Sequence, residues 1–244
     1  MAPSGPISLT IVVPAFNEER RLRATLVVLS DYLRRQPWDW EIRVVDDGSL
    51  DSTVRIVESF AVGEPRVVVQ REPHRGKGGA VKAGLIAASA EYRFICDADL
   101  SMPIAEISRF LPPAAAGFDV AIGSREGQAA RRIGEPTYRH VMGRLFNFVV
   151  QRLVLPGIDD SQCGFKMFTA RAVASIFPLV TVNGWAFDVE ALAIARARGL
   201  RILEVPIEWH YREESQVKMM RDGLGMLRAL LRIRARRRRG VYTS

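Results

Sequence analysis

The sequence predicts an α/β fold built on a mostly parallel central sheet flanked by helices, and three observations lead to this prediction. Over residues 1–123, short apolar runs alternate with longer stretches of helical periodicity, and parallel strands need such crossover helices between them. Hydrophobic residues make up 48% of the chain and charged residues 25%, which is the balance of a globular domain. The length of 244 residues is enough to bury one large core.

The strands predicted in the first half are β-rich apolar runs that end at polar or turn-forming residues. They are Ile7–Val13, Glu41–Val45, Val67–Gln70, Arg93–Cys96 and Asp119–Gly123. The helices between them show helical spacing, as at Leu22, Leu26 and Leu29, or a recognisable start, such as the proline in the first turn of the last one. These helices are predicted at Glu18–Arg35, at Ser52–Phe60 behind an N-cap at Asp51 or Ser52, at Gly79–Ala90 and at Pro103–Ala115.

The pattern changes after Gly123. The polar segment Arg125–Pro136 is predicted to be a loop or lid, and Pro206 places the strand Arg201–His210 at a sheet edge or a bulge. The other predicted elements are helix Tyr138–Leu155, strand Gln162–Thr169, helix Arg171–Phe177, helix Phe187–Arg198 and helix Ser215–Arg239. We expect residues 1–211 to form one domain, and residues 212–244 to form a basic helix and tail that belong to this domain or extend from it.

Several function classes are excluded by missing motifs. Cys96 and Cys163 are too far apart for a CxxC motif, and the three histidines lack zinc-ligand spacing. No GxGxxG follows the first strand and no GxxxxGK[ST] occurs, which argues against a dinucleotide dehydrogenase and a P-loop NTPase. No signal peptide precedes the first strand and no window holds the ~18 apolar residues of a membrane span, so we expect a cytoplasmic protein.

Asp97 and Asp99 follow an apolar strand and are the first candidates for a metal site. Residues i and i+2 of an extended chain project to one side, so both carboxylates would face one point at the sheet edge. At about 4 Å they would repel by about 4 kcal/mol at an effective dielectric near 20, and a divalent cation removes this repulsion. Hard oxygen ligands favour Mg²⁺ or Mn²⁺ over zinc. The alternative is an acidic helix cap, which Asp99 alone could provide.

Three further polar clusters follow predicted strands. Residues 14–18 (PAFNE) follow the first strand, 46–49 (DDGS) the second and 74–79 (HRGKGG) the third. Each cluster alone is typical of a turn or a helix cap. Ligands of parallel α/β sheets bind beyond the carboxyl ends of the strands, so clusters at one edge predict one shared binding site.

These motifs resemble those of the family 2 inverting glycosyltransferases with the Rossmann-like GT-A fold. The resemblance rests on residues 14–18, 45–49 (VDDGS), 76–78 (GKG), 97–100 (DADL) and 123–125 (GSR), and it extends from Ile7 to about Met220. Residues 160–166 (DSQCGFK) and 185–190 (WAFDVE) resemble more narrowly the polyprenyl-phosphate, or dolichyl-phosphate, glucosyltransferases and their mannosyl relatives.

The resemblance implies a role for each matching residue, with a UDP-linked sugar favoured over a GDP-linked one as donor. It places Mg²⁺ or Mn²⁺ on Asp97 and Asp99, against the donor diphosphate. Donor-binding residues would be Pro14, Ala15, Asn17, Glu18, Asp47, Lys77, Asp97, Ala98 and Asp99. The diphosphate and the phosphate of the acceptor, a polyprenyl phosphate, would be surrounded by Arg125, Arg139, Arg212 and Lys218.

The expected chemistry gives Arg139 and Asp188 the candidate catalytic roles. An inverting transfer displaces the nucleoside diphosphate in one step, so cations are needed where negative charge develops. A phosphate monoester, with a second pKa near ~6, needs no base, and Arg139 would bring the two anions together unless it is a solvated surface arginine. Asp188 would orient Lys166 or an arginine. With a glycan or small hydroxyl acceptor, the alternative function, Asp188 would instead be an essential base.

The C-terminal segment carries most of the net charge of +8. Residues 212–244 hold 10 of the 35 Lys and Arg residues but 3 of the 27 Asp and Glu residues, which gives this segment +7 and residues 1–211 +1. Leu224, Leu227 and Leu231 follow helical spacing, and an apolar face with cationic flanks is typical of a helix in a membrane interface. We therefore expect peripheral binding to an anionic membrane surface, with residues 236–244 dispensable for catalysis.

Two alternatives to this membrane role of the C-terminal segment remain. The helix could pack on the domain and leave a solvated basic end. The arginine run could bind nucleic acid, although it lacks interleaved aromatic residues, and we expect no nucleic-acid partner. The four tryptophans are interpreted as packing residues, and His74 and His140 as loop or surface residues.

Overall fold

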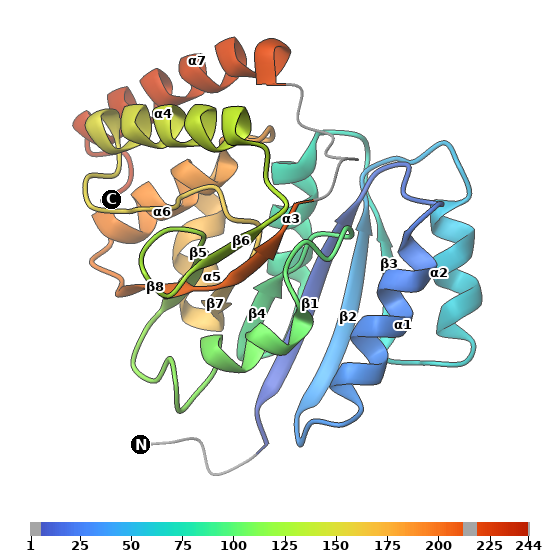
Figure 1. Cartoon of the computed structure of the whole chain (residues 1–244). Coiled ribbons are helices and arrows are strands. Elements are labelled where there is room, and N and C mark those ends of the chain that lie inside the picture. The colour runs from blue at the N-terminus through green and yellow to red at the C-terminus, as the bar shows by residue number, and fades with distance from the viewer. Residues whose placement is uncertain (1–5, 212–218, 244) are drawn as a thin grey trace.

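The computed structural model describes residues 6–211 and 219–243, which form three layers with a sheet in the middle (Figure 1). The sheet has seven strands in the order β3-β2-β1-β4-β7-β5-β8. Every neighbouring pair is parallel except those of β7, which runs antiparallel to β4 and to β5. The strands are β1 (Ser8–Ala15), β2 (Asp39–Asp46), β3 (Val67–Arg71), β4 (Tyr92–Ile95), β5 (Val120–Ser124), β7 (Lys166–Thr169) and β8 (Ile202–Pro206). The predicted mostly parallel sheet is confirmed.

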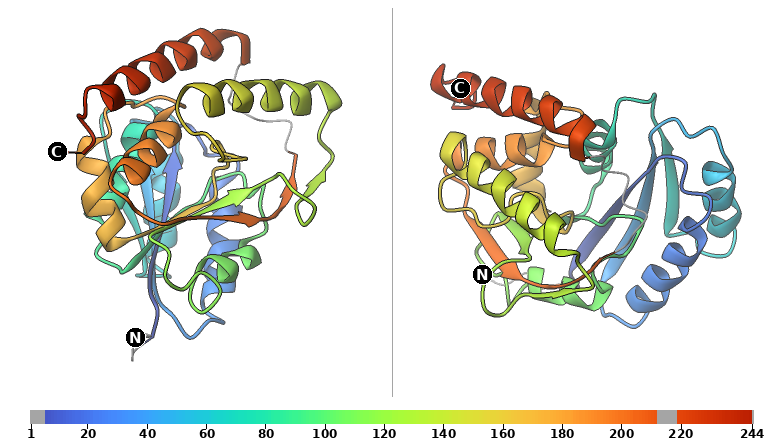
Figure 2. Two further views of the ribbon diagram at one scale, coloured as in Figure 1. Left: turned by 90° about the vertical axis from the view of Figure 1, so that its left-hand side faces the viewer. Right: turned by 45° about the horizontal axis from the view of Figure 1, so that its top comes forward.

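Helices cover both faces of this sheet (Figures 1 and 2). One face carries α1 (Leu22–Leu33), α2 (Thr53–Ala61) and the 3₁₀ helix η1 (Ile104–Phe110). The other carries α3 (Lys77–Ala87), α5 (Ala170–Ile176), the 3₁₀ helix η2 (Phe177–Leu179) and α6 (Phe187–Ala197). Outside this second layer, α4 (Thr137–Leu153) and α7 (Met219–Arg238) lie side by side.

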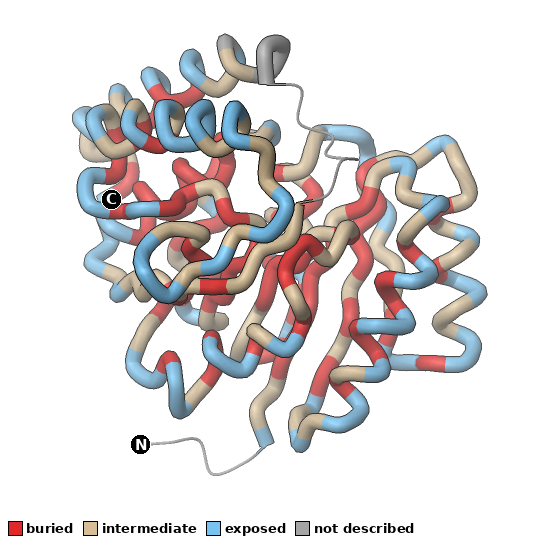
Figure 3. Tube along the Cα trace, viewed as in Figure 1, coloured by how far each residue is buried: buried red, intermediate tan, exposed pale blue. Residues whose placement is uncertain are grey.

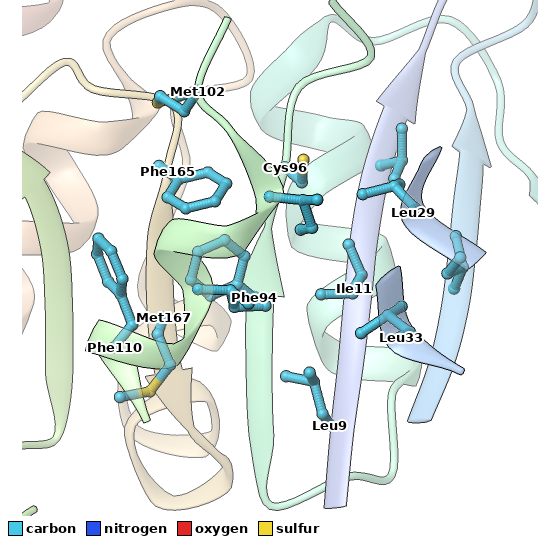
Figure 4. Packing of buried hydrophobic residues seen from close by; sticks show 14 of the residues in the cluster. Leu9, Ile11, Leu29, Leu33, Phe94, Cys96, Met102, Phe110, Phe165 and Met167 are labelled. Carbon is cyan, nitrogen blue, oxygen red and sulfur yellow. The ribbon is translucent and has the colours of Figure 1, made fainter. Parts of the chain in front are cut away.

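The core divides along β1, whose side chains alternate between the two faces. Leu9 and Ile11 pack with α1, whereas Val12 packs with α3, and buried residues follow the strands throughout (Figure 3). Beneath the carboxyl ends of the strands, the buried rings of Phe94, Phe110 and Phe165 meet edge to face, with centroids 4.4 to 5.4 Å apart (Figure 4). This aromatic cluster gives the adjoining strand ends a rigid base.

A glycine sets how closely α3 approaches the sheet. A Cβ at Gly84 would lie 2.6 Å from Val45 Cγ2 and 2.7 Å from Val12 Cγ1, so no larger residue fits between α3 and the first two strands. This close packing holds the N-terminal end of α3, which begins at Lys77, beside the carboxyl ends of β1 and β2.

Three predicted elements differ from the structure. The segment predicted as a loop contains β6 (Arg131–Ile133), which pairs in parallel with β9 (Glu208–His210) in a second, two-stranded sheet. The predicted strand Arg201–His210 is therefore two strands in different sheets, with Pro206 as the last residue of edge strand β8. The predicted helix Pro103–Ala115 is shortened to η1, since Pro112 and Pro113 lack the backbone N–H groups that would continue it.

The described C-terminal residues pack on the same core as the rest of the chain. Leu230, Ile233 and Tyr242 are fully buried, and the Tyr242 hydroxyl donates to Glu190 Oε1 of α6 at 2.9 Å. Leu227 and Leu231, on the outer side of α7, remain exposed. Within residues 6–211 and 219–243, no helix combines the length and the apolar character needed to cross a membrane.

Candidate functional site

A cavity of about 350 Å³ opens at the carboxyl ends of β1, β2 and β4, and we call it the strand-end cavity. It brings together residues of the polar clusters that follow these strands and of the turn before α3. All the predicted donor-binding residues except Asn17 line it: Pro14, Ala15, Glu18, Asp47, Lys77, Asp97, Ala98 and Asp99. The predicted convergence of these residues at one sheet edge is what the structure shows.

Asn17 instead joins two turns. Its backbone has a φ of 55°, a left-handed conformation that asparagine tolerates better than most residues. Its side-chain oxygen accepts a hydrogen bond from the backbone N–H of Leu50 at 2.9 Å, and its own N–H donates to Ser49 Oγ at 2.9 Å. Asn17 therefore holds the turn after β1 against the turn after β2, and we assign it a structural role.

Asp47 holds the turn at residues 74–76 against the strand-end cavity. Its carboxylate accepts hydrogen bonds from the backbone N–H groups of Arg75 and Gly76, both at 2.8 Å, and lies 2.8 Å from His74 Nδ1. The His74 ring stacks on Phe16, with centroids 4.2 Å apart. His74, interpreted from the sequence as a loop residue, thus forms with Phe16 a flat wall of the strand-end cavity.

Asp97 and Asp99 meet through a turn and not through the extended geometry that we predicted. β4 ends at Ile95. The N–H of Leu100, whose φ is 46°, donates to the Asp97 carbonyl at 3.3 Å, and the N–H of Ser101 donates to Asp99 Oδ1 at 2.9 Å. Both carboxylates nevertheless line the same cavity, as predicted.

Lys77 and Gly164 determine where the Asp97 carboxylate lies. Lys77 Nζ is 2.6 Å from Asp97 Oδ1. Burial lowers the pKa of Lys77, but the carboxylates of Asp97 and Asp188 outweigh it and raise the pKa above its ordinary value. On the other side, a Cβ at Gly164 would lie 2.1 Å from Asp97 Oδ2, so Asp97 occupies space that only glycine leaves open.

The two carboxylates fit a divalent cation that binds together with a phosphate-bearing ligand. Across the described parts of the chain, no group of three or more His, Cys, Asp or Glu side chains could hold a metal without such a ligand. Mg²⁺ and similar hard cations are commonly bound by one or two carboxylates and complete their coordination with substrate phosphates and water. An open cavity lined by Asp97 and Asp99 meets this requirement.

A second cavity of about 360 Å³, the helix-side cavity, continues from Asp97 and Asp99 toward α4 and α7. The predicted residues Arg125, Arg139 and Asp188 line it. Apolar side chains of the two helices, Met142, Phe146 and Met226, line it as well, and Trp185 lines both this cavity and the strand-end cavity. The helix-side cavity therefore combines arginine and carboxylate side chains with an apolar wall.

Aromatic rings and an acidic partner position the two arginines. Arg125 makes a bidentate pair with Asp160, at 2.7 and 2.9 Å, and its guanidinium carbon lies 5.4 Å from the centroid of Trp209. Burial lowers the pKa of Arg125, but Asp160 outweighs it and raises the pKa well above the ordinary value. Arg139 lies over Tyr211, 5.2 Å from its centroid. Trp209, interpreted from the sequence as a packing residue, therefore supports a cavity-lining arginine.

Asp188 is paired with a buried lysine. Lys166 Nζ lies 2.9 Å from Asp188 Oδ1 and also donates to the Cys163 carbonyl, and the Lys166 side chain is 1% exposed. Burial raises the pKa of Asp188, and Lys166 and Lys77 offset only part of this rise. Of the roles predicted for Asp188, the ion pair with Lys166 has the required geometry. Arg212 and Lys218 lie outside the described residues.

Trp185, interpreted from the sequence as a packing residue, and Gly164, which was given no role, both belong to the candidate site. Trp185 lines both cavities, and Lys77 Nζ lies 5.4 Å from its ring centroid. Both residues belong to the motifs at 160–166 and 185–190, which were singled out only for their resemblance to a family. Their position in these motifs was the available signal, because spacing alone does not show that they reach Asp97 and Lys77.

Comparison with known sequences gives one family and several curated relatives. The model of "Glycosyl transferase family 2" matches residues 10–177. The dolichyl-phosphate beta-glucosyltransferase of Homo sapiens is 34% identical over 249 residues, which cover 96% of this chain and 77% of the relative. An enzyme of the same name from Trichomonas vaginalis is 34% identical over 222 residues, covering 86% of this chain and 66% of its own length.

Solved structures with low sequence identity share the fold. Mannosyl-3-phosphoglycerate synthase from Rubrobacter xylanophilus has a TM-score of 0.68 at 19% identity, over 96% of this chain and 74% of its own. Glucosyl-3-phosphoglycerate synthase from Mycobacterium tuberculosis, in complex with Mn²⁺, UDP-glucose and phosphoglyceric acid, has a TM-score of 0.67 at 18% identity, over 94% and 80% of the two chains.

Proposed function

Because this chain belongs to glycosyltransferase family 2 and has the GT-A fold, we propose that it transfers a hexosyl group from a sugar nucleotide to a polyprenyl phosphate. One observation carries the proposal: the strand-end cavity, with its two carboxylates, continues into a cavity that has arginines on one part of its wall and apolar side chains on another. An amphiphilic phosphate acceptor requires this combination. The curated relatives named dolichyl-phosphate beta-glucosyltransferases support it, and make glucose the first sugar to test.

In this proposal the strand-end cavity takes a UDP-linked sugar. Pro14, Ala15 and Glu18 would contact the nucleoside, while Asp47 fixes the turn at residues 74–76. Asp97 and Asp99 would hold Mg²⁺ or Mn²⁺ against the diphosphate. The bound cation would neutralise charge on the leaving group. A relative of the same fold has been solved with Mn²⁺ and UDP-glucose, which supports both assignments.

The acceptor phosphate would bind in the helix-side cavity, where Arg125 and Arg139 attract it. An oxygen of the phosphate forms a bond to the anomeric carbon while the bond from that carbon to the diphosphate breaks, and the diphosphate leaves with the electron pair. The acceptor is already ionised at neutral pH, so no group has to remove a proton from it. Asp188, paired with Lys166, then acts as a positioning residue.

The test of this function is a donor and acceptor screen. Labelled UDP-glucose, UDP-galactose, UDP-N-acetylglucosamine and GDP-mannose are each incubated with polyprenyl phosphate in detergent and Mg²⁺ or Mn²⁺, and label is followed into the organic phase. We expect transfer from UDP-glucose that stops when the metal is chelated. Transfer to a glycan or a small hydroxyl compound, with none to polyprenyl phosphate, would contradict the proposal.

We further propose that the chain binds a membrane surface through an apolar face formed by α4 and α7. Its members are large apolar side chains of these helices that remain exposed, and Figure 3 shows exposed positions along the outer side of α4. These side chains are Tyr138, Val141, Met142, Leu145 and Phe148 of α4 and Leu227 and Leu231 of α7. Met142 also lines the helix-side cavity, so this α4–α7 face adjoins the proposed path of the acceptor.

Flotation with anionic vesicles tests this face. The double variant Leu145→Glu/Phe148→Glu should lose most vesicle binding, since two apolar contacts become charged. Leu50→Glu is a control, because Leu50 is 92% exposed in the turn after β2 and belongs to neither α4 nor α7. Equal binding by both variants would exclude the α4–α7 face.

A further inference from the structure

We propose that a third cavity is a binding site for the phosphate headgroup of an anionic membrane phospholipid. It has a volume of about 720 Å³ and lies between the loop at residues 181–186 and α7. Arg232 and Arg236 of α7 line it together with Arg239, which directly follows the helix, so we call it the arginine cavity. Their spacing of four and three residues places all three on one face of the helix.

The arginine cavity has an excess of positive charge. Glu190 is the one carboxylate in its described lining, and it is fully buried. Glu190 already accepts hydrogen bonds from the backbone N–H groups of Thr181 and Val182, both at 2.7 Å, and from the hydroxyls of Thr181 and Tyr242, both at 2.9 Å. Among the residues that the structure describes, neither Arg232 nor Arg239 has an acidic partner within ion-pair distance.

Arg236 is held in place but retains an unused donor. Its guanidinium carbon lies 5.5 Å from the centroid of Tyr242, and its Nε lies 3.8 Å from Glu190 Oε1, which is too long for a hydrogen bond. The Nε is buried and has no hydrogen-bond partner. The rest of the Arg236 side chain is 33% exposed and lines the cavity, so its guanidinium is available to an anionic oxygen there.

The rest of the wall favours a phosphate that is attached to an apolar chain. Val182, Trp185 and Met226, which are partly exposed, line the arginine cavity, and a free phosphate would leave their exposed apolar surface in contact with water. The cavity is also formed by α7, whose exposed Leu227 and Leu231 belong to the α4–α7 face. A phospholipid headgroup meets both conditions, because its phosphate can reach the arginines from the surface on which α7 would lie.

The arginine cavity is separate from the helix-side cavity, although both contact Trp185 and Met226. Arg125 and Arg139, proposed to bind the acceptor phosphate, do not line it. The inference therefore concerns a ligand other than the donor and the acceptor, and it can be tested without either of them.

The test measures binding of short-chain phospholipids to the full chain by titration calorimetry. Dihexanoyl phosphatidylglycerol, dihexanoyl phosphatidylcholine and inorganic phosphate are compared as monomers in solution. Arg232→Gln/Arg239→Gln removes two cavity arginines, and Arg228→Gln/Arg238→Gln is the control with the same change of charge on exposed positions of α7 outside the cavity. Arg236 is left unchanged, because it contacts Tyr242 in the core.

We expect saturable binding of the phosphatidylglycerol, weakened about tenfold or more in the cavity variant and unchanged in the control. Transfer activity on detergent-solubilised acceptor should be unchanged in both variants. Equal losses in both variants would show attraction to charge alone, and equal binding of inorganic phosphate would show a site for free phosphate. Each of these two results would overturn the proposal. So would the absence of any binding, or displacement of the lipid by a soluble polyprenyl phosphate.

Discussion

Gly164→Ala tests whether the position of the Asp97 carboxylate controls the reaction. The new Cβ would lie 2.1 Å from Asp97 Oδ2, whereas ordinary contact begins at 3.4 Å, so the two atoms must separate by about 1.3 Å. The backbone at position 164 has little freedom to move, because its neighbours Cys163 and Phe165 are buried in the core. The Asp97 carboxylate must therefore be displaced.

This displacement has a large expected effect on rate and a small one on stability. A misplacement of about 1 Å in a reacting group typically costs roughly 100-fold in rate, and we expect a loss of that size in kcat/KM. The Lys77–Asp97 pair is partly exposed, at 18% and 26%, so weakening it should cost about 1 kcal/mol or less. The variant should fold and should fail in catalysis.

The measurement combines initial rates of label transfer, taken over a range of Mn²⁺ concentrations, with thermal unfolding. Half-saturation should need more Mn²⁺ in Gly164→Ala, because one of the two carboxylates has moved. Gly63→Ala is the matched control, since its Cβ would meet no atom closer than the Phe60 carbonyl oxygen at 3.8 Å. Wild-type kcat/KM in a folded Gly164→Ala variant, or an equal loss in Gly63→Ala, would refute the reasoning.

Four further variants address the metal, the ion pairs and the C-terminal residues. Asp99→Asn should abolish most transfer, as chelation does, without changing the unfolding temperature; full activity would contradict the metal assignment. Asp188→Asn leaves a buried lysine unpaired, so chemical denaturation should show a loss of about 3 to 5 kcal/mol, yet the folded fraction should transfer to a phosphate better than Asp99→Asn does. The charge of Arg125 outweighs the effect of burial and holds the pKa of the Asp160 carboxyl below its ordinary 3.8. The ionised carboxylate therefore stabilises the fold above pH 3.8, and this contribution is lost as the pH falls. The stability deficit of Asp160→Asn should shrink below pH 4, and a deficit independent of pH would refute this. Deletion of residues 236–244 removes the buried Tyr242, which should lower the free energy of unfolding by roughly 3 kcal/mol or more; an unchanged unfolding temperature would contradict this packing role of Tyr242.

The sequence predicted the layers and the sheet edge well because both follow from local periodicity. The strands β1 to β5 and the helices α1 to α3 lie close to their predicted ranges, whereas the helix predicted before β5 is shortened to η1. The antiparallel direction of β7 and the pairing of β6 with β9 were not predicted, since strand direction and three-residue strands depend on contacts distant in sequence. The resemblance to the GT-A family, and not the spacing of residues, indicated which kind of α/β fold the chain has.

In the candidate site, too, the positions that follow from local sequence were predicted and those that depend on distant contacts were missed. Asp97 and Asp99 were placed at the right edge, but the turn through Leu100 depends on tertiary packing and was missed. Asn17 matches a family motif, yet its side chain serves the adjoining turn, because a motif shows which residues are present and not where they point. Trp185 and Trp209 reach the cavities from loops and strands far along the chain, where spacing carries no information.

The antiparallel strand β7 also determines how long one edge of β4 stays unpaired while the chain is synthesised on the ribosome. Ile95 of β4 pairs with Lys166 of β7, so 71 residues must be added before the outer edge of β4 gains its partner. At about 5 to 20 residues per second, that edge stays open for roughly 4 to 14 s. During this interval the chain Tyr92–Ile95 presents unpaired backbone groups and apolar side chains, which are a template for aggregation. Chaperones that cover this edge during synthesis should therefore increase how much of this enzyme is recovered in soluble form.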